Sequence, residues 1–153
     1  MNELIFVAYC RLGRGVFANR PIRCGEEILE FTGRRIGFEE ALARGERQCD
    51  PLQIGPREYI DIGEPAVLIN HSCEPNAGIH NDRFLVAIAD IAQGDQISYD
   101  YSTTMDEDGW NLECRCETPT CRGKVGDFKT LPPALRDRYM RLGIVLSYIA
   151  DRQ

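Results

Sequence analysis

The chain has 153 residues, a formal charge of −6 and an isoelectric point near 5. This length predicts one domain, or one domain with a small appendage, that buries about two-thirds of its unfolded surface. Leu, Ile, Val and Phe make up about a quarter of the residues, which is more than a disordered chain carries. The acidic balance argues against binding to nucleic-acid phosphates, which needs a clustered basic face. It fits a basic partner, or simply solubility.

Short strands separated by turns are expected along the first hundred residues. In chain order the pattern predicts strands at residues 4–9, 12–18 and 28–31, a helix at 38–44 that Gly45 closes, and strands at 58–62, 84–89 and 97–101. Residues 22–28 and 91–97 share the form Ile-x-x-Gly-acid-x-Ile, a tight turn that feeds a strand. The pattern is typical of a mainly β fold built from several small sheets.

The C-terminal part has a helical pattern. Two prolines, Pro132 and Pro133, open a stretch whose apolar residues recur every three or four positions: Leu135, Tyr139, Leu142, Leu146 and Ile149. This spacing predicts one C-terminal helix packed on the body of the protein. Gly143 is expected to weaken or bend the helix.

No segment has the ~18 to 20 apolar residues of a membrane span. Residues 4–10 are apolar, but an acidic residue precedes them and no cleavage site follows. We therefore expect a first strand at this position rather than a signal peptide.

Three of the seven cysteines, Cys114, Cys116 and Cys121, fall within eight residues. An odd cysteine count without an export signal argues against a disulfide framework. Structural zinc takes four ligands in a tetrahedron, with Zn–S distances of about 2.3 Å. The cluster therefore predicts a zinc site whose fourth ligand lies elsewhere, and the alternative is three unconnected thiols. The candidates for that ligand are His71, His80, Cys10, Cys24, Cys49 and Cys73.

Four segments together closely resemble SET-domain protein lysine methyltransferases with a post-SET zinc motif. They are Gly-Arg-Gly-Val-Phe-Ala at 13–18, Ile-Asn-His-Ser-Cys-Glu-Pro-Asn at 69–76, Gly-Asp-Gln-Ile-Ser-Tyr-Asp-Tyr at 94–101, and the cysteine cluster. Their order and spacing agree with the family across residues 4–125. The Asn-His-Ser-Cys-x-Pro-Asn element is highly specific, whereas a Gly-x-Gly turn alone would be a weak signal.

The resemblance implies a β-clip (SET) fold, in which several small β-sheets surround a pseudoknot that brings the Asn70 and Tyr101 segments together. It divides the chain into a SET domain at 1–105, a post-SET zinc segment at 106–126 and a C-terminal helical extension at 127–153. It also implies S-adenosylmethionine and Zn²⁺ as cofactors, with the methyl donor and the acceptor lysine entering a narrow channel from opposite faces.

Site residues follow from the same resemblance. Tyr101 and Tyr99 correspond to the catalytic tyrosines, although both positions also suit plain strand packing. The cofactor-binding residues would be Gly13, Arg14, Gly15, Asn70, His71 and Tyr101, and the zinc ligands Cys73, Cys114, Cys116 and Cys121. Tyr59 is expected either in the cofactor or substrate cleft or in the core of a sheet.

Three positions depart from the family pattern. Phe31 stands where many members have a tyrosine, and Glu117 stands where glycine is frequent after the second cysteine. An asparagine that is common shortly before the Asn-His pair is missing, with Glu64 and Pro65 in that region.

The leading hypothesis is an S-adenosylmethionine-dependent protein lysine N-methyltransferase that makes mainly monomethyl-lysine, with some dimethyl product, on a basic protein or histone-like tail. The alternative is a catalytically silent SET module that binds a peptide or protein partner. A zinc-dependent nucleic-acid binder and a hydrolase using Cys73 and His71 are less favoured. We expect a monomer in the cytoplasm, or in the nucleus if the substrate is a histone, with no nucleic-acid or membrane partner.

Overall fold

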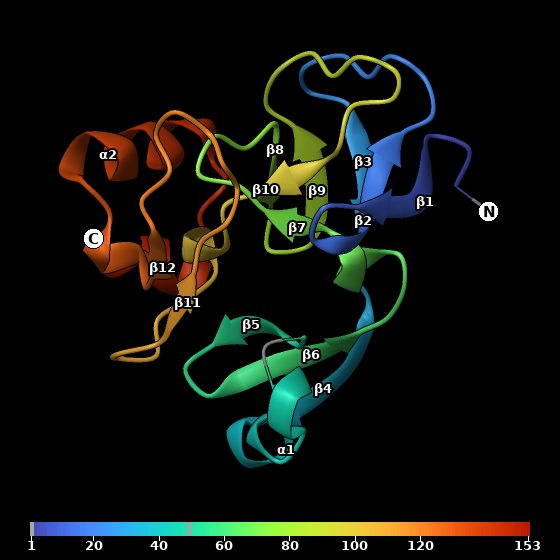
Figure 1. Ribbon diagram of the computed structural model, residues 1–153. Helices are drawn as coiled ribbons and strands as arrows, with labels where there is room; N and C mark the ends of the chain where they lie inside the picture. Colours follow the sequence, from blue (N-terminus) through green and yellow to red (C-terminus); the bar gives the residue numbers. More distant parts are fainter. Residues whose placement is uncertain (1, 49) are drawn as a thin grey trace.

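The computed structural model describes residues 2–48 and 50–153. This part of the chain forms five small β-sheets of two or three strands, joined by loops and short helices (Figure 1). Its longest helix has 10 residues, and none of its helices has the length and apolar character needed to cross a membrane. The expected fold of several small sheets is confirmed.

Two sheets form the N-terminal part of the molecule. Strands β1 (Ile5–Cys10) and β2 (Gly13–Ala18) make an antiparallel hairpin. Strands β3 (Glu27–Glu30), β9 (Phe84–Ala87) and β8 (Ala77–His80) form a second, antiparallel sheet. The two repeated turns lie together, because Ile22 and Ile91 exchange both main-chain hydrogen bonds at 2.8 Å.

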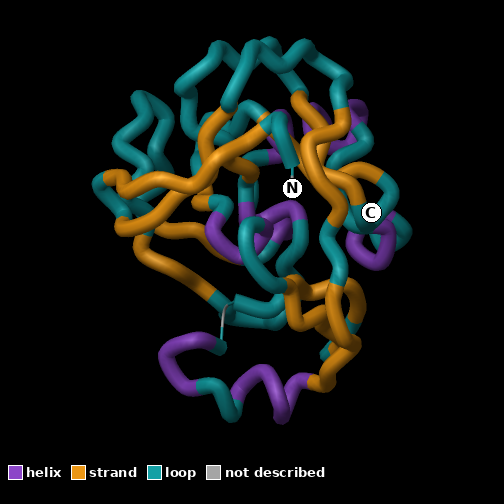
Figure 2. Tube along the Cα trace, turned by 90° about the vertical axis from the view of Figure 1, so that its right-hand side faces the viewer, coloured by secondary structure: helices purple, strands orange, loops and turns teal. Residues whose placement is uncertain are grey.

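A third sheet lies at the lower end of the molecule (Figures 1 and 2), and its Leu52, Ile60 and Ile62 side chains belong to the main core. It consists of β4 (Gly33–Gly37), β6 (Glu58–Ile62) and β5 (Leu52–Gly55), and carries α1 (Phe38–Leu42) and the 3₁₀ helix η1 (Gly45–Arg47). The helix expected at 38–44 is two residues shorter in the structure. Gly45 has a φ of +61° and begins the 3₁₀ turn.

The parallel pairing of β7 (Asn70–His71) with β10 (Ser98–Tyr99) joins segments almost thirty residues apart. The 3₁₀ helix η2 (Ala66–Leu68) precedes β7, and η3 (Tyr101–Thr103) follows β10. The strand expected at 97–101 therefore ends early, because the Asp100 carboxylate accepts the Ser102 N–H and caps η3. The pairing brings the Asn70 and Tyr101 segments together.

The C-terminal part starts with the hairpin of β11 (Asn111–Glu113) and β12 (Lys124–Gly126), followed by the 3₁₀ helix η4 (Phe128–Thr130). The prediction of one continuous helix is wrong: α2 (Pro133–Leu142) and α3 (Ser147–Ala150) are separate. Gly143 ends α2 with a φ of +68°, which a helix cannot continue.

This break changes which side chains of the apolar stripe are buried. Leu142 is 39% exposed rather than packed, whereas Leu146 is fully buried in the main core. Tyr139 and Ile149 are buried as expected, in a second cluster with Phe128 and Leu131.

Six of the strands in the described residues were not expected: β4, β5, β7, β8, β11 and β12. They are two to five residues long and carry at most two apolar side chains each, as in Gly-Arg-Arg-Ile-Gly of β4 and Ala-Gly-Ile-His of β8. Such strands form because a partner strand satisfies their backbone groups, which no local pattern reports.

Candidate active site

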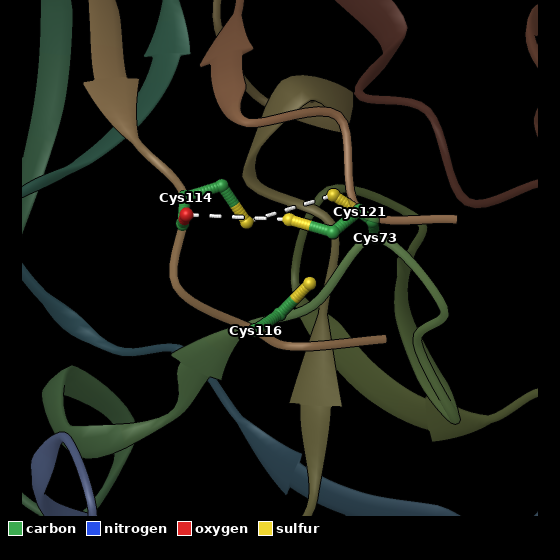
Figure 3. A group of neighbouring side chains, drawn as sticks. All are labelled: Cys73, Cys114, Cys116 and Cys121. Carbon is green, nitrogen blue, oxygen red and sulfur yellow. Dashed lines mark hydrogen bonds between the residues drawn. The ribbon is translucent and has the colours of Figure 1, made fainter. Parts of the chain in front are cut away.

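Four cysteine side chains converge from three segments (Figure 3). Cys73 follows β7, Cys114 and Cys116 follow β11, and Cys121 precedes β12. All four Sγ atoms lie within 4.8 Å of one another, and those of Cys73 and Cys114 are 3.6 Å apart. A zinc–thiolate tetrahedron with Zn–S distances of about 2.3 Å has edges of about 3.8 Å. The donor set and spacing therefore fit structural zinc.

The other candidates for the fourth ligand are not part of this cluster. His80 is exposed, and Cys10 and Cys24 are not among the four converging residues. Cys49 lies outside the described residues. The main-chain N–H of Arg122 donates to the Cys73 sulfur at 3.4 Å, which stabilises a thiolate at that position.

The His71 side chain lies between the cysteine cluster and the Tyr101 backbone. Its Nδ1 accepts the Tyr101 main-chain N–H at 3.1 Å, and its Nε2 lies 3.4 Å from the Cys73 sulfur. Burial lowers the pKa of His71 to about 4, so the ring is neutral near pH 7. Because Nδ1 is an acceptor, the ring proton is on Nε2 and points at the Cys73 sulfur.

A cavity of about 150 Å³ lies beside β7, on the side of the β1–β2 turn. It is smaller than the ~300 Å³ of a typical ligand pocket, so it encloses only part of a nucleotide-sized ligand. The residues that line it are Cys10, Arg11, Leu12, Asn70, His71, Ser72, Gln96, Ser98 and Cys116.

Gly15 does not line this cavity, but it packs against two side chains that do. The Asn70 amide donates to Gln96 Oε1 at 2.8 Å and to the main-chain oxygen of Arg14 at 3.2 Å. A Cβ at Gly15 would approach Gln96 Oε1 to 2.7 Å and the Asn70 amide nitrogen to 3.2 Å. The absence of a side chain therefore permits the close packing of these two amides. The Arg14 side chain itself pairs with Glu64, and Gly13 and Arg14 are not among the lining residues.

A second cavity of about 320 Å³ lies between the third sheet, η2 and the segment after η3. Aromatic side chains form much of its wall: Phe38, Tyr59, Tyr99, Tyr101 and Trp110. The charged residues that line it, Asp50 and Glu107, are both acidic.

The two cavities adjoin the same short segment, because Ile69 lines the larger one and Asn70 lines the smaller one. Tyr101 lines the larger cavity and is tied to this segment, because its hydroxyl donates to the main-chain oxygen of Ile69 at 2.7 Å. The Tyr101 ring contacts the rings of His71 and Tyr99, with centroid distances of 5.3 and 5.0 Å. Phe31 packs edge-on against Tyr99 at 6.0 Å.

The structure thus brings together Asn70, His71, Tyr99, Tyr101 and the four cysteines. Tyr59, for which a cleft and a core position were both open, is buried in the third sheet and also lines the larger cavity. Sequence reasoning missed Gln96 and Trp110 as lining residues. Gln96 lies in the second repeated turn, and Trp110 is the sole tryptophan of the chain, so both carried a sequence signal.

Residues 13–102, more than half of the chain, match the SET domain. The chain belongs to the SET-domain family. The chain is 34% identical over 135 residues to histone-lysine N-methyltransferase ATX2 of Arabidopsis thaliana, covering 75% of this chain and 12% of that protein. It is 29% identical over 129 residues to histone-lysine N-methyltransferase 2B of Homo sapiens, covering 72% and 5%. The chain thus spans a small part of these relatives.

Solved structures show the same fold. KRYPTONITE in complex with mCHH DNA, an H3(1-15) peptide and SAH superposes with a TM-score of 0.62 and 25% identity, covering 80% of this chain and 29% of that chain. The Polycomb Repressive Complex 2 of Chaetomium thermophilum, bound to S-adenosylmethionine, superposes with a TM-score of 0.58 and 23% identity, covering 70% and 16%. The second likeness concerns the fold alone.

Proposed function

We propose that this SET domain is an S-adenosylmethionine-dependent protein lysine N-methyltransferase. The observation that carries the proposal is the position of Tyr101 in the wall of the larger cavity, with its hydroxyl bonded to the main chain just before Asn70. Two cavities that border the same segment, one at Ile69 and the other at Asn70, suit a reaction in which donor and acceptor approach in line from opposite sides. Such alignment supplies much of the acceleration of a displacement.

The smaller cavity would hold the methionine end of the cofactor. When bound, S-adenosylmethionine supplies the sulfonium methyl group. Asn70 and His71 would bind the cofactor through side-chain and main-chain groups, and the turn at Gly13, Arg14 and Gly15 would lie against it. The close packing of Gly15 against Asn70 and Gln96, which both line the smaller cavity, supports this assignment.

The larger cavity would hold the acceptor lysine. A free lysine has a pKa near 10.4, and the amine must lose its proton before it attacks. Aromatic walls and a neighbouring sulfonium charge both lower the lysine pKa. Tyr101 would orient the amine, and its oxygen together with that of Ile69 would face the partly positive methyl group. Asp50 and Glu107 would favour a basic substrate segment.

Zinc at the four cysteines would hold the segment at 106–126, which we propose as the post-SET segment, against the cofactor cavity. Cys116 supports this role, because it belongs to the cysteine cluster and also lines the smaller cavity. The SET domain would then span 1–105, and the helical extension 127–153.

The product is proposed to be mainly monomethyl-lysine, with some dimethyl-lysine. Tyr99 is 7% exposed and lines the larger cavity beside Tyr101. Burial raises its pKa well above the usual value, so its hydroxyl remains protonated and able to hold the amine. Phe31 offers no second hydroxyl at its edge.

The decisive experiment is methyl transfer from labelled S-adenosylmethionine to an array of lysine peptides. Histone peptides come first, because the similar proteins are named as histone-lysine methyltransferases. Calorimetry should show that zinc-loaded protein binds S-adenosylmethionine. Absence of cofactor binding would overturn the proposal, and peptide binding without transfer would favour the silent binding module.

A further inference from the structure

Asp100 lies between the two tyrosines of the site in the sequence, but it lines neither cavity. The side chain is 1% exposed. Its two oxygens accept hydrogen bonds from Arg122, Tyr139 and the Ser102 main chain, all between 2.9 and 3.0 Å.

These bonds join three parts of the chain. Arg122 comes directly after Cys121 in the sequence, and its guanidinium donates one hydrogen bond to each oxygen of Asp100. Tyr139 is a fully buried residue of α2 in the C-terminal extension. A planar two-point pairing of this kind is geometrically specific, and a buried carboxylate that loses a partner keeps its desolvation cost.

The same carboxylate fixes the backbone that carries Tyr101. The Tyr101 N–H donates to His71, and the next N–H, that of Ser102, donates to Asp100 at 3.0 Å. Both peptide groups that flank the Tyr101 Cα are therefore held by side chains. A shift of Asp100 would turn the Ser102 peptide and move the tyrosine ring.

Helix α2 is connected to the site through Tyr139 and Asp100. No residue of 127–153 lines either cavity, so the extension acts on the site only through groups that contact it indirectly. Tyr139 supplies such a group, because its hydroxyl lies 2.9 Å from Asp100 Oδ2.

We propose that Asp100 is a positioning residue, which transmits the placement of the cysteine cluster, through Arg122, and of α2, through Tyr139, to the Tyr101 ring. We name this arrangement of Asp100, Arg122 and Tyr139 the Asp100 clasp. Its effect on methyl transfer rests on the proposed function, whereas its effect on the Tyr101 backbone does not.

The test compares Tyr139→Phe with Ser147→Ala in the full zinc-loaded chain. Tyr139→Phe removes one hydroxyl from the clasp and retains the buried ring. Ser147→Ala is the control, because it removes a hydroxyl of the same C-terminal extension that bonds to Asp82, away from both cavities. Amide hydrogen exchange at Ser102, resolved by NMR, reports on the clasp, and kcat and KM with a lysine peptide report on transfer.

In Tyr139→Phe we expect exchange at Ser102 to be faster and kcat lower, each by about fivefold, the equivalent of one hydrogen bond, with KM unchanged. Ser147→Ala should change neither quantity. The proposal is overturned if Ser102 exchange in Tyr139→Phe equals that of the control, or if exchange rises while kcat is unchanged. A wild-type chain that transfers no methyl group would refute the proposed function, and Ser102 exchange would then decide the clasp.

Discussion

The Tyr101 hydroxyl donates a 2.7 Å hydrogen bond to the main-chain oxygen of Ile69, the residue that precedes the Asn-His pair. This bond fixes two oxygen atoms at the segment that borders both cavities. It depends on the parallel pairing of β7 with β10, which aligns His71 with Tyr99. The position of the phenol is thus set by the fold before any ligand binds.

Replacing Tyr101 with phenylalanine should leave the fold intact and reduce turnover by on the order of 100-fold, as loss of one preorganised polar group at a reaction centre does. The lost hydrogen bond should lower the free energy of unfolding by about 1 kcal/mol. Steady-state kinetics and thermal unfolding measure the two effects.

Tyr148→Phe is the matched control for this change. Tyr148 also donates from a partly buried phenol to a main-chain oxygen, that of Thr104 at 2.6 Å. It should show a similar loss of stability and a much smaller loss of turnover, because Tyr148 lines neither cavity, although Thr104 lines the larger one. Near-normal turnover in Tyr101→Phe would contradict the catalytic assignment.

Native mass spectrometry should find one zinc ion per chain. Chelation should loosen residues 111–126, because the three cysteines of this segment lose their common anchor to Cys73. Since Cys116 also lines the smaller cavity, cofactor binding should be lost together with the metal. Hydrogen exchange and calorimetry measure these effects.

Cys24→Ser, at an exposed cysteine outside the cluster, should behave as wild type. Full activity of metal-free protein would rule out the zinc role.

Tyr99→Phe should increase the yield of dimethyl- and trimethyl-lysine. Release of the hydrogen bond that the Tyr99 hydroxyl would make to the amine costs about 1 kcal/mol, a rate effect of about fivefold on each later transfer. Mass spectrometry of the peptide product follows the methylation states over time. The proposed role of Tyr99 in limiting methylation is wrong if the natural protein already makes mainly trimethyl-lysine, or if Tyr99→Phe shows no gain in higher methylation.

Glu117 has a φ of +58°, the left-handed region that favours glycine. Its side chain forms an exposed ion pair with Arg11. Glu117→Gly should relieve the backbone strain and raise the free energy of unfolding by about 1 kcal/mol relative to Glu117→Ala, which removes the same ion pair and keeps the β-carbon. The melting temperature of the zinc-loaded glycine variant should be higher by about 2–4 °C. Equal melting temperatures would show that position 117 is not strained.

Local chemistry made part of the site visible in the sequence. Three thiols within eight residues have few roles in an ordinary core, so they indicated a metal site without any tertiary information. The Asn-His-Ser-Cys-Glu-Pro-Asn element indicated a cofactor site only through its resemblance to SET-domain methyltransferases. The turn residues predicted the first hairpin and the two repeated turns, because glycine at a fixed offset selects the backbone conformation there.

The rest depended on contacts between distant segments. From residue chemistry alone, six candidates for the fourth zinc ligand remained open. The structure brings Cys73 to the cluster, although it precedes Cys114 by 41 residues in the sequence. The apolar stripe of the C-terminal part predicted one helix, but the left-handed turn at Gly143 sends Leu146 into the main core.

The sequence by itself determined which side chains are available for chemistry, since residue type and local spacing fix the donor atoms and the turns. Only the tertiary structure decided how they meet. The two-residue strands β7 and β10 have no apolar pattern, and the carboxylate of Asp100 finds its partners 22 and 39 residues away. Such contacts form because buried backbone and charged groups must be paired somewhere in the folded chain, and the partner is selected by the packing of the whole domain.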